Sequence, residues 1–347
     1  MSKTLTRPTI DEVARSAGVS TATVSRVLNK PQTVRDALRK QVMGAISRLG
    51  YVPDAGARAL TLRRSGTIGA VFPTVDNAIF AKAIDALQRR LALDGVQLLL
   101  ATSGYSPESE MHEAINLVTR GVDALVLCGF SQHPNLLSFL NQRGLPCVHV
   151  MGHPGMEGRL SVGFDNARGM HNATRYLLDL GHRHIAMLAG VSRNNDRARE
   201  RIAGLRSALQ DAGVDWPDSF LIESPYALAE ARSGMRQLMQ LNPRPTGVIC
   251  GNDVLALGAM LEAFHMNLQI PEDVSVIGFD DLEMSRHLRP ALTTVRVPTE
   301  SLWSKAAELL LTKLRNEPVA MHTEVEVALV VRESCGPVAP KSASAAS

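Results

Sequence analysis

The stretch GVSTATVSRVLN, from Gly18 to Asn29, has the composition of a helix that contacts another molecule. Small residues follow the glycine, and Ser20 can cap the helix by accepting a hydrogen bond from a free backbone amide. The inward stripe at helical spacing consists of Val24, Val27 and Leu28. The outward face consists of Thr21, Ala22, Ser25 and Arg26. So narrow an apolar stripe suits a small helical unit, and the small polar face leaves room for a close partner.

Two further helices are expected on either side of this one. Thr9-Ile10-Asp11-Glu12 has the T-x-x-E spacing of a capping box. The apolar stripe of that first helix consists of Ile10, Val13, Ala14 and Ala17. Two helices joined by the short turn at Gly18 form a helix-turn-helix, and the segment TVRDALRKQVMGAISRLG supplies a third helix. We therefore predict a small all-α domain over residues 1–50.

Positive charge is concentrated at this end of the chain. Residues 1–64 hold twelve Lys and Arg against four Asp and Glu, a net of +8, whereas the rest of the 347 residues carry a net of −5. A basic head on an acidic body indicates a polyanionic partner, although a solvated basic surface is the alternative. An α-helix fits the major groove of DNA, and Arg26 can donate two hydrogen bonds to a guanine. Double-stranded DNA is therefore the expected partner.

The remainder of the chain alternates between short apolar runs, such as IGAVFP and VDALVLCG, and amphipathic segments of helix length. This alternation predicts parallel α/β sheets, and its two series predict two lobes with a ligand cleft between them. Residues 51–65 form a linker that could become helical between residues 55 and 62. The expected lobes span about 66–164 with 294–325, and about 165–293 with 326–336. The low-complexity tail, residues 337–347, is predicted to be disordered.

The chain shows no sign of export or of a membrane span. It has no 18-residue apolar run, and its N-terminus lacks the core of a signal peptide. The four cysteines form no CxxC pair and suit free thiols in a reducing compartment. They are Cys128, Cys147, Cys250 and Cys335. A cytoplasmic protein is the simplest expectation.

Eight segments make the sequence similar to one family of bacterial transcription regulators, the lactose/galactose repressor (LacI/GalR) family. In family order they are IDEVARSAGVSTATVSRVLN, LGYVP, ARAL, VGFDN, LGHRHIA, GND with ALGAM, DVSVIGFDD and LRPALTTVRVP. The resemblance implies a helix-turn-helix DNA-binding domain followed by two α/β lobes similar to periplasmic sugar-binding proteins. It also implies a homodimer on a roughly palindromic operator. The C-terminal end lacks apolar heptads, which favours a dimer over a tetramer.

The resemblance assigns roles in DNA binding to particular residues. Base edges in the major groove would face Thr21, Ala22 and Arg26. Phosphate contacts and helix capping would fall to Ser20, Thr23, Ser25 and Asn29. The ARAL segment would be a hinge helix that lays Ala57 and Arg58 along the minor groove. Leu60 would wedge into a central base step and bend the duplex, unless it is a simple packing leucine in a linker.

The resemblance also places an effector between the lobes. The implied contacts are Ile79, Phe80, Asp165, Arg201, Asn252 and Asp280. A buried arginine and aspartate suit a polyol, because each hydroxyl needs a partner once water is excluded. The alternative is that these residues form ion pairs that stabilise the lobes.

One position departs from the family pattern. Many members carry an aspartate at the end of the fourth strand, where this chain has Met151. Meanwhile Arg193, Arg197 and Arg199 crowd the segment ahead of Arg201. Loss of a carboxylate and gain of cations favour an anionic effector, such as a sugar acid or a sugar phosphate, over a neutral sugar. The VGFDN and GHRHIA segments are similar to gluconate-type repressors. A solvated arginine-rich helix end is the alternative.

No pattern for catalysis or cofactor binding was found. The sequence holds no GxSxG, GKS/T, HExxH or GxGxxG motif, so we expect no catalytic residue and no cofactor. His182 and His184 have no nearby Cys or Glu partner, which favours a structural use over a metal site. An operator-binding repressor controlled by a small molecule is therefore the leading hypothesis, and induction and co-repression both stay open. A solute-binding receptor and a sugar-modifying enzyme are the alternatives.

Overall fold

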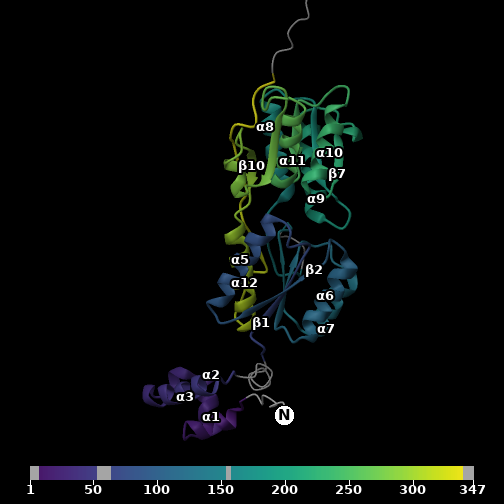
Figure 1. Cartoon of the computed structure of the whole chain (residues 1–347). Helices are drawn as coiled ribbons and strands as arrows, with labels where there is room; N and C mark the ends of the chain where they lie inside the picture. Colours follow the sequence, from purple (N-terminus) through teal and green to yellow (C-terminus); the bar gives the residue numbers. More distant parts are fainter. Residues whose placement is uncertain (1–7, 53–63, 154–157, 339–347) are drawn as a thin grey trace, which may run out of the picture. The chain divides into compact units, whose positions relative to one another are not determined.

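The computed structural model describes residues 8–52, 64–153 and 158–338, which divide into two compact units, residues 1–65 and 66–347. Unit 1 contains three helices among its described residues, α1 (Ile10–Ser16), α2 (Thr21–Asn29) and α3 (Asp36–Leu49). The predicted hinge helix lies outside the described residues, as does nearly all of the predicted tail. In Figure 1 the helices of unit 1 are purple and the two lobes of unit 2 run from blue to yellow.

The capping box predicted for α1 is present. Glu12 N donates to Thr9 Oγ1 at 3.3 Å, and Thr9 N donates to Glu12 Oε2 at 2.9 Å. The small core of unit 1 consists of Val13, Ala14, Ala17, Val24, Val27, Val42 and Ala45. The third helix begins at Asp36, later than predicted, because a 3₁₀ turn over Pro31–Thr33 precedes it.

The first lobe of unit 2 holds a six-stranded sheet in the order β11-β5-β4-β3-β1-β2. Its strands are β1 (Thr67–Phe72), β2 (Gln97–Thr102), β3 (Ala124–Cys128), β4 (Cys147–Val150), β5 (Ser161–Gly163) and β11 (His322–Glu324). Its helices are α5 (Ala78–Ala92), α6 (Pro107–Thr119), α7 (Pro134–Gln142) and α12 (Thr299–Leu314). Buried residues of α5 and α12 pack on one face of the sheet, and those of α6 and α7 pack on the other.

The second lobe repeats this plan in the order β12-β10-β9-β8-β6-β7. Its strands are β6 (Ile185–Gly190), β7 (Leu221–Ser224), β8 (Gly247–Cys250), β9 (Ser275–Asp280), β10 (Thr293–Arg296) and β12 (Ala328–Val330). Its α-helices are α8 (Asn166–Asp179), α9 (Asp196–Asp211), α10 (Leu228–Met239) and α11 (Asp253–His265), with 3₁₀ turns at Asp218–Phe220 and Glu283–Arg286. Figure 1 shows helices flanking the sheet of each lobe.

The chain passes between the lobes at positions close to those predicted, with one difference. Residues 294–296 were assigned to the first lobe, but they pair with β9 of the second sheet, so the chain leaves that lobe only after Arg296. All strand pairs are parallel except β10 with β12. Because parallel strands end at one edge, the loops after β1, β2 and β3 of the first lobe can meet those after β6, β7 and β9 of the second. None of the described helices is long and apolar enough to span a membrane.

Candidate nucleic-acid face and interlobe pocket

The outward face of α2 is exposed in the described part of unit 1. Thr21, Ala22 and Arg26 are exposed, and within residues 8–52 no hydrogen bond or ion pair engages the Arg26 guanidinium. Ser20 caps the helix, since its Oγ accepts from Thr23 N at 3.2 Å. The exposed face of α2 therefore presents small side chains in its first turn and the Arg26 cation in its last turn, a composition that can approach the edges of base pairs.

The other predicted DNA contacts on α2 bond to one another. Ser20 Oγ lies 3.0 Å from Thr23 Oγ1, and Asn29 Nδ2 donates to Ser25 Oγ at 3.2 Å. These pairs fix the side chains on the flanks of the helix, where phosphates would lie. Ala57, Arg58 and Leu60 lie outside the described residues.

One positioning contact in unit 1 was not predicted. Gln41 on α3 donates through Nε2 to the backbone oxygen of Ala17 at 2.8 Å. Ala17 ends α1 just before the turn, so Gln41 ties the third helix to the turn that sets the angle of α2. The only sign of this contact in the sequence is that Gln41 is a polar residue next to the apolar stripe of α3.

A pocket of about 30 Å³ lies between the two lobes. Five of the six predicted effector residues line it. They are Ile79, Phe80, Arg201, Asn252 and Asp280. The sixth, Asp165, does not line it; its Oδ1 caps α8 by accepting from Arg168 N at 2.8 Å. Met151, the departure from the family pattern, lies in the pocket wall.

Arg201 is held on all sides. Its Nε donates to Asn166 Oδ1 at 2.9 Å, Nη1 donates to the backbone oxygen of Gly251, and Nη2 lies 3.8 Å from Asp280 Oδ1. The guanidinium also stacks over the Phe279 ring, 3.7 Å from its centroid. Only 4 % of the residue is exposed. Arg201 therefore joins α9 to α8 and to the ends of β8 and β9.

Asp280 ends β9 with an unsatisfied oxygen. Its Oδ1 is buried and accepts no hydrogen bond from any described residue. Burial raises the pKa of the carboxyl to about 7, against the opposing attraction of Arg201. Its φ of +111° lies in a region that non-glycine residues rarely adopt. A strained, unsatisfied carboxylate in a cleft is typical of a functional site.

The remaining predicted residues shape the pocket through helix starts. Asn252 caps α11, with Oδ1 accepting from Leu255 N at 2.9 Å. Ile79 and Phe80 lie in the first turn of α5, where Asn77 is the cap and accepts from Ile79 N at 3.2 Å. Helix N-termini from both lobes thus point at one small volume.

Sequence reasoning missed part of the pocket wall. It did not single out Asn77, Tyr105, Asn195 and Tyr226, and it named Arg197 as a nearby cation without placing it among the contact residues. Tyr105 follows β2 and Tyr226 follows β7, and their ring centroids lie 6.1 Å apart across the lobes. Its spacing could have selected Arg197 from the three arginines ahead of Arg201, because it lies four residues before Arg201 and thus on the same face of α9. Arg199 lies on another face and is exposed.

Contacts across the lobes hold the pocket nearly closed. Phe130 N, in the loop after β3, donates to Asp196 Oδ2 at 2.9 Å, and Asp196 N donates to Ser131 Oγ at 3.1 Å. Arg199 adds a hydrogen bond to Ser131 Oγ at 3.0 Å. A cavity of 30 Å³ holds about one or two waters, so a larger ligand requires the lobes to part.

A wider chamber of about 390 Å³ adjoins the inner pocket. The two share Asn77, Tyr105, Asn195 and Tyr226, and the outer chamber also reaches Arg193. Its size falls in the range of small-molecule sites. The tyrosine pair therefore lies between an outer chamber and the charged inner pocket.

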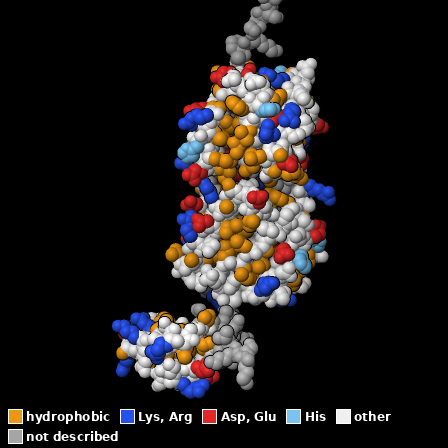
Figure 2. Space-filling model, viewed as in Figure 1, with side chains coloured by type: hydrophobic (Ala, Val, Ile, Leu, Met, Phe, Trp, Pro, Cys, Tyr) orange, Lys and Arg blue, Asp and Glu red, His pale blue; other side chains and the backbone are white. Residues whose placement is uncertain are grey.

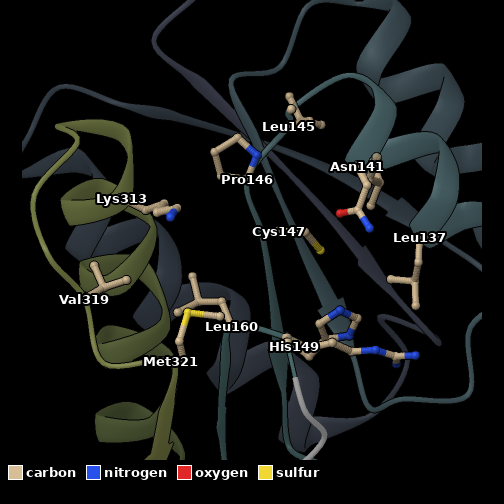
Figure 3. Close-up of a pocket in the computed structure, with 14 residues that line it drawn as sticks. Leu137, Asn141, Leu145, Pro146, Cys147, His149, Leu160, Lys313, Val319 and Met321 are labelled. Atoms are coloured by element: carbon tan, nitrogen blue, oxygen red, sulfur yellow. The ribbon is translucent and has the colours of Figure 1, made fainter.

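A larger hollow of about 540 Å³ lies within the first lobe alone (Figure 3). It is bordered by α7, β4 and the chain after α12, and Figure 3 shows Val319 and Met321 facing His149 across it. The His149 ring stacks on Phe130 and its pKa falls to about 4 because it is buried. None of the predicted effector residues lines this hollow, so the interlobe pocket is the better candidate for an effector site.

His182 has the structural use that was expected of it. Its Nδ1 lies 2.9 Å from Thr246 Oγ1 and its Nε2 lies 3.0 Å from the backbone oxygen of Gly336. The ring thereby joins the loop before β6 to the loop before β8 and to the end of the lobe. Across the described part of the chain, no group of His, Cys, Asp and Glu is arranged to hold a metal ion.

Comparison with known proteins connects the two sites. Residues 9–54 match the bacterial regulatory proteins of the lacI family, and residues 174–335 match a periplasmic binding protein-like domain. The HTH-type transcriptional repressor PurR of Salmonella typhimurium is 35% identical over 331 residues, covering 94% of this chain and 96% of PurR. This chain belongs to the LacI family. It is a DNA-binding transcription regulator and not an enzyme.

Solved structures show the same LacI-family architecture. The lac repressor dimer bound to operator and the anti-inducer ONPF is 26% identical with a TM-score of 0.85, covering 95% of this chain and 100% of that one. The transcriptional regulator CelR in complex with cellobiose is 32% identical with a TM-score of 0.69, covering 94% of this chain and 100% of that one. The LacI-family fold thus accounts for the helix-turn-helix unit and for both α/β lobes.

Proposed function

We propose that this LacI-family regulator is an operator-binding repressor whose affinity for DNA changes when a small polar metabolite binds between its lobes. One observation carries the proposal: a free, exposed recognition face on α2 belongs to the same chain as an interlobe pocket with an unsatisfied carboxylate. The first feature is useful to a DNA reader, and the second to a ligand receptor. A regulator needs both.

The proposed readers on α2 have separate tasks. Arg26 donates to a guanine in the major groove, while Thr21 and Ala22 allow the helix to approach the base edges. Ser20, Thr23, Ser25 and Asn29 contact phosphates and fix the register. In the linker, Ala57 and Arg58 follow the minor groove and Leu60 inserts into a base step.

The effector side of the proposal rests on Asp280, Arg201 and Asn252, with Ile79 and Phe80 as the apolar wall. Asp165 supports the site by capping α8 near the cleft. A ligand that parts or draws together the lobes changes the cross-lobe bonds of Asp196, and this two-state motion carries the signal to the DNA-binding unit. The effector class is a sugar, a sugar acid or a sugar phosphate.

We infer that the functional form is a homodimer, as the lac repressor in its solved complex is. Figure 2 shows hydrophobic side chains gathered over both lobes of unit 2. Edge strand β2 exposes Leu99 and Leu100. Helix α11 exposes Leu261 and Phe264, and the exposed fraction of Phe264 is 82 %. Exposed apolar edges of this kind are normally covered by a partner, here a second copy. Sedimentation of the purified protein measures this directly.

Operator selection tests the proposal. The full-length protein is used to select duplexes from a random pool, and the affinity for the selected site is measured by fluorescence anisotropy at several salt concentrations. Arg26→Ala should cost about 1–3 kcal/mol on that site and relax discrimination at one base pair. Lys40→Ala is the matched control, since it removes one exposed cation from α3 and should weaken binding to all duplexes alike. Failure to enrich any sequence, or equal losses for Arg26→Ala on selected and random DNA, would contradict the assignment.

A further inference from the structure

The two buried arginines of the interlobe pocket differ in how many of their donors are used. Arg201 is occupied by Asn166, the Gly251 carbonyl and Asp280, and the Phe279 ring covers one face of its guanidinium. Nε and Nη1 are committed to the protein, while Nη2 faces Asp280 at an ion-pair distance that is too long for a hydrogen bond. Arg201 is therefore fixed in position and places its positive charge next to Asp280.

Arg197 is buried almost as deeply but has donors to spare. Its exposed fraction is 7 %, and it lines the inner pocket one helical turn before Arg201. Its single hydrogen bond among the described residues runs from Nη1 to Asp196 Oδ1 at 3.0 Å. Nε and Nη2 have no such partner and are not fully sealed from solvent. Arg197 lines the inner pocket and also a second pocket of about 20 Å³ beside Glu110.

The negative charge beside Arg197 is already shared with the first lobe. Asp196 Oδ2 accepts from Phe130 N at 2.9 Å, and Oδ1 accepts from Ser131 Oγ at 3.4 Å as well as from Arg197. Gly129 makes this arrangement possible, because a Cβ there would lie 2.0 Å from Arg197 Nη1. The chain thus holds the Arg197 guanidinium against its own backbone in the wall of the inner pocket.

Asp280, in the same pocket, lacks a hydrogen-bond donor rather than an acceptor in the described part of the chain. Its buried Oδ1 lacks a donor among the described residues, and burial raises the pKa of this carboxyl to about 7. A hydroxyl of a ligand would satisfy that oxygen. The pocket therefore offers free N–H donors on a cation and a free acceptor on a carboxylate, with Met151 and Phe80 as apolar walls.

We propose that Arg197 is the anion-binding residue of the effector site, and that the effector is a polyhydroxy monocarboxylic acid with its carboxylate on Arg197 and a hydroxyl on Asp280. This rests on the proposed function, since it narrows the ligand of the same pocket. The planar fork of Arg197 matches a carboxylate in shape. A phosphate dianion would bring a second negative charge to a region where Arg197 and Arg201 already face Asp196 and Asp280, with the buried Glu110 beside Arg197. A monoanion fits that balance better.

The outer chamber gives such a ligand a route. It has a volume of about 390 Å³ and carries Arg193 in its lining, so an anion meets a cation before it reaches the tyrosine pair. Parting of Tyr105 from Tyr226 joins the outer chamber to the inner pocket. The hydroxyl-bearing end then reaches Asp280 while the carboxylate stays on Arg197.

A panel of ligands matched by carbon skeleton tests this with the full-length protein. Five- and six-carbon aldonates, the corresponding alditols and the corresponding aldose phosphates are compared by thermal shift and then by calorimetry, beginning with gluconate, glucitol and glucose 6-phosphate. We expect one or more aldonates to bind, and the matching alditol to bind about 10- to 100-fold more weakly, because a charge-assisted hydrogen bond is lost. An alditol or a phosphate that binds as tightly as its aldonate, or a panel in which no carboxylate binds, overturns the proposal.

Two variants locate the effect. Arg197→Met should reduce aldonate affinity to that of the alditol and leave alditol affinity unchanged. Arg197→Lys should recover part of the difference, which a purely structural role would not produce. Arg206→Met removes an exposed cation from the same helix and should keep the full preference for the acid. An Arg197→Met protein that folds and still prefers the acid contradicts the assignment.

The proposed function is measured separately in the same samples. Operator affinity without ligand reports on the DNA-binding proposal, and its change on adding ligand reports on the effector site. Regulation of operator binding by a neutral sugar would refute the role of Arg197 and leave the regulator intact. Absence of operator binding in the wild-type protein would refute the proposed function itself.

Discussion

Replacement of Asp280 by Asn should make the protein less sensitive to pH. Asp280 is 4 % exposed, its Oδ1 lacks a donor among the described residues, and burial raises its pKa from 3.8 to about 7. The folded state therefore binds a proton that the unfolded chain releases near pH 4. Wherever the folded state binds more protons, stability falls as pH rises, so the wild-type protein loses stability between pH 4 and pH 8 through this group.

The size of the effect follows from the two pKa values. At pH 5 the raised pKa of Asp280 lowers the free energy of unfolding by about 1.7 kcal/mol, because the carboxyl ionises more readily in the unfolded chain. At pH 8 it lowers this free energy by about 4.3 kcal/mol. The wild-type free energy of unfolding should thus fall by about 2.6 kcal/mol more than that of Asp280→Asn over this range. Loss of the Arg201 partner adds a penalty that does not depend on pH, because a guanidinium stays protonated throughout.

Urea denaturation at pH 5 and pH 8 provides the measurement. Trp216 reports on the second lobe and Trp303, which is fully buried on α12, reports on the first. The change should be seen through Trp216. Asp215→Asn is a matched control, since it neutralises an exposed carboxylate and should leave the pH profile parallel to that of the wild-type protein. Parallel profiles for Asp280→Asn and the wild-type protein would show that Asp280 is ionised at no cost, and the reasoning from its burial would be wrong.

Two further substitutions probe the second lobe. Arg201→Ala should remove the ligand response. It should also lower the free energy of unfolding by about 3–5 kcal/mol, because it leaves Asp280 buried without its partner. A ligand-induced rise in melting temperature equal to that of the wild-type protein would place Arg201 outside the effector site. Gly204→Ala should cost about 1–3 kcal/mol in chemical denaturation, since a Cβ on this residue of α9 would lie 2.1 Å from the backbone oxygen of Ala167, and an unchanged midpoint would mean that α8 and α9 can separate without cost.

The helices of unit 1 could be predicted because their signals are local. The capping residues Thr9 and Ser20 and the apolar stripe of α2 depend on spacings of three and four residues, which the sequence displays directly. The 3₁₀ turn at Pro31–Thr33 was missed although its hydrogen bonds are local, with Thr33 N and Thr33 Oγ1 both donating to the Lys30 carbonyl. Gln41 was missed because its partner, Ala17, lies at the end of another helix.

The pocket was predicted only where the family resemblance reached it. Tyr105 and Tyr226 come from loops of different lobes, and no periodicity connects them. Arg197 is a different case, because its spacing from Arg201 fixes a shared face of α9. The sequence could not show that Arg201 donates two side-chain hydrogen bonds within the protein whereas Arg197 donates one, because this depends on the positions of Asn166, the Gly251 carbonyl and Asp196.

Two buried aspartates at the edge of the second sheet differ in how their oxygens are bonded, and the difference supports placing only Asp280 in the proposed effector site. Asp253 is fully buried, but Oδ2 accepts from Leu282 N at 2.7 Å and from Ser285 Oγ at 2.6 Å, and Oδ1 accepts from Thr294 Oγ1. These bonds oppose the effect of burial, which raises the pKa of Asp253 to about 6. Asp253 therefore serves the fold by joining α11 to β10 and to the turn after β9.

Asp280 is buried to a similar degree without comparable donors, and it has an unfavourable φ as well. A residue that costs stability in two ways persists where a ligand can offset the cost. A hydroxyl donated to Oδ1 would favour the ionised form and lower its pKa, so the wild-type protein should become less sensitive to pH when its effector is bound. The Asp280→Asn protein offers no such gain, and the difference between the two pH profiles should shrink as ligand is added.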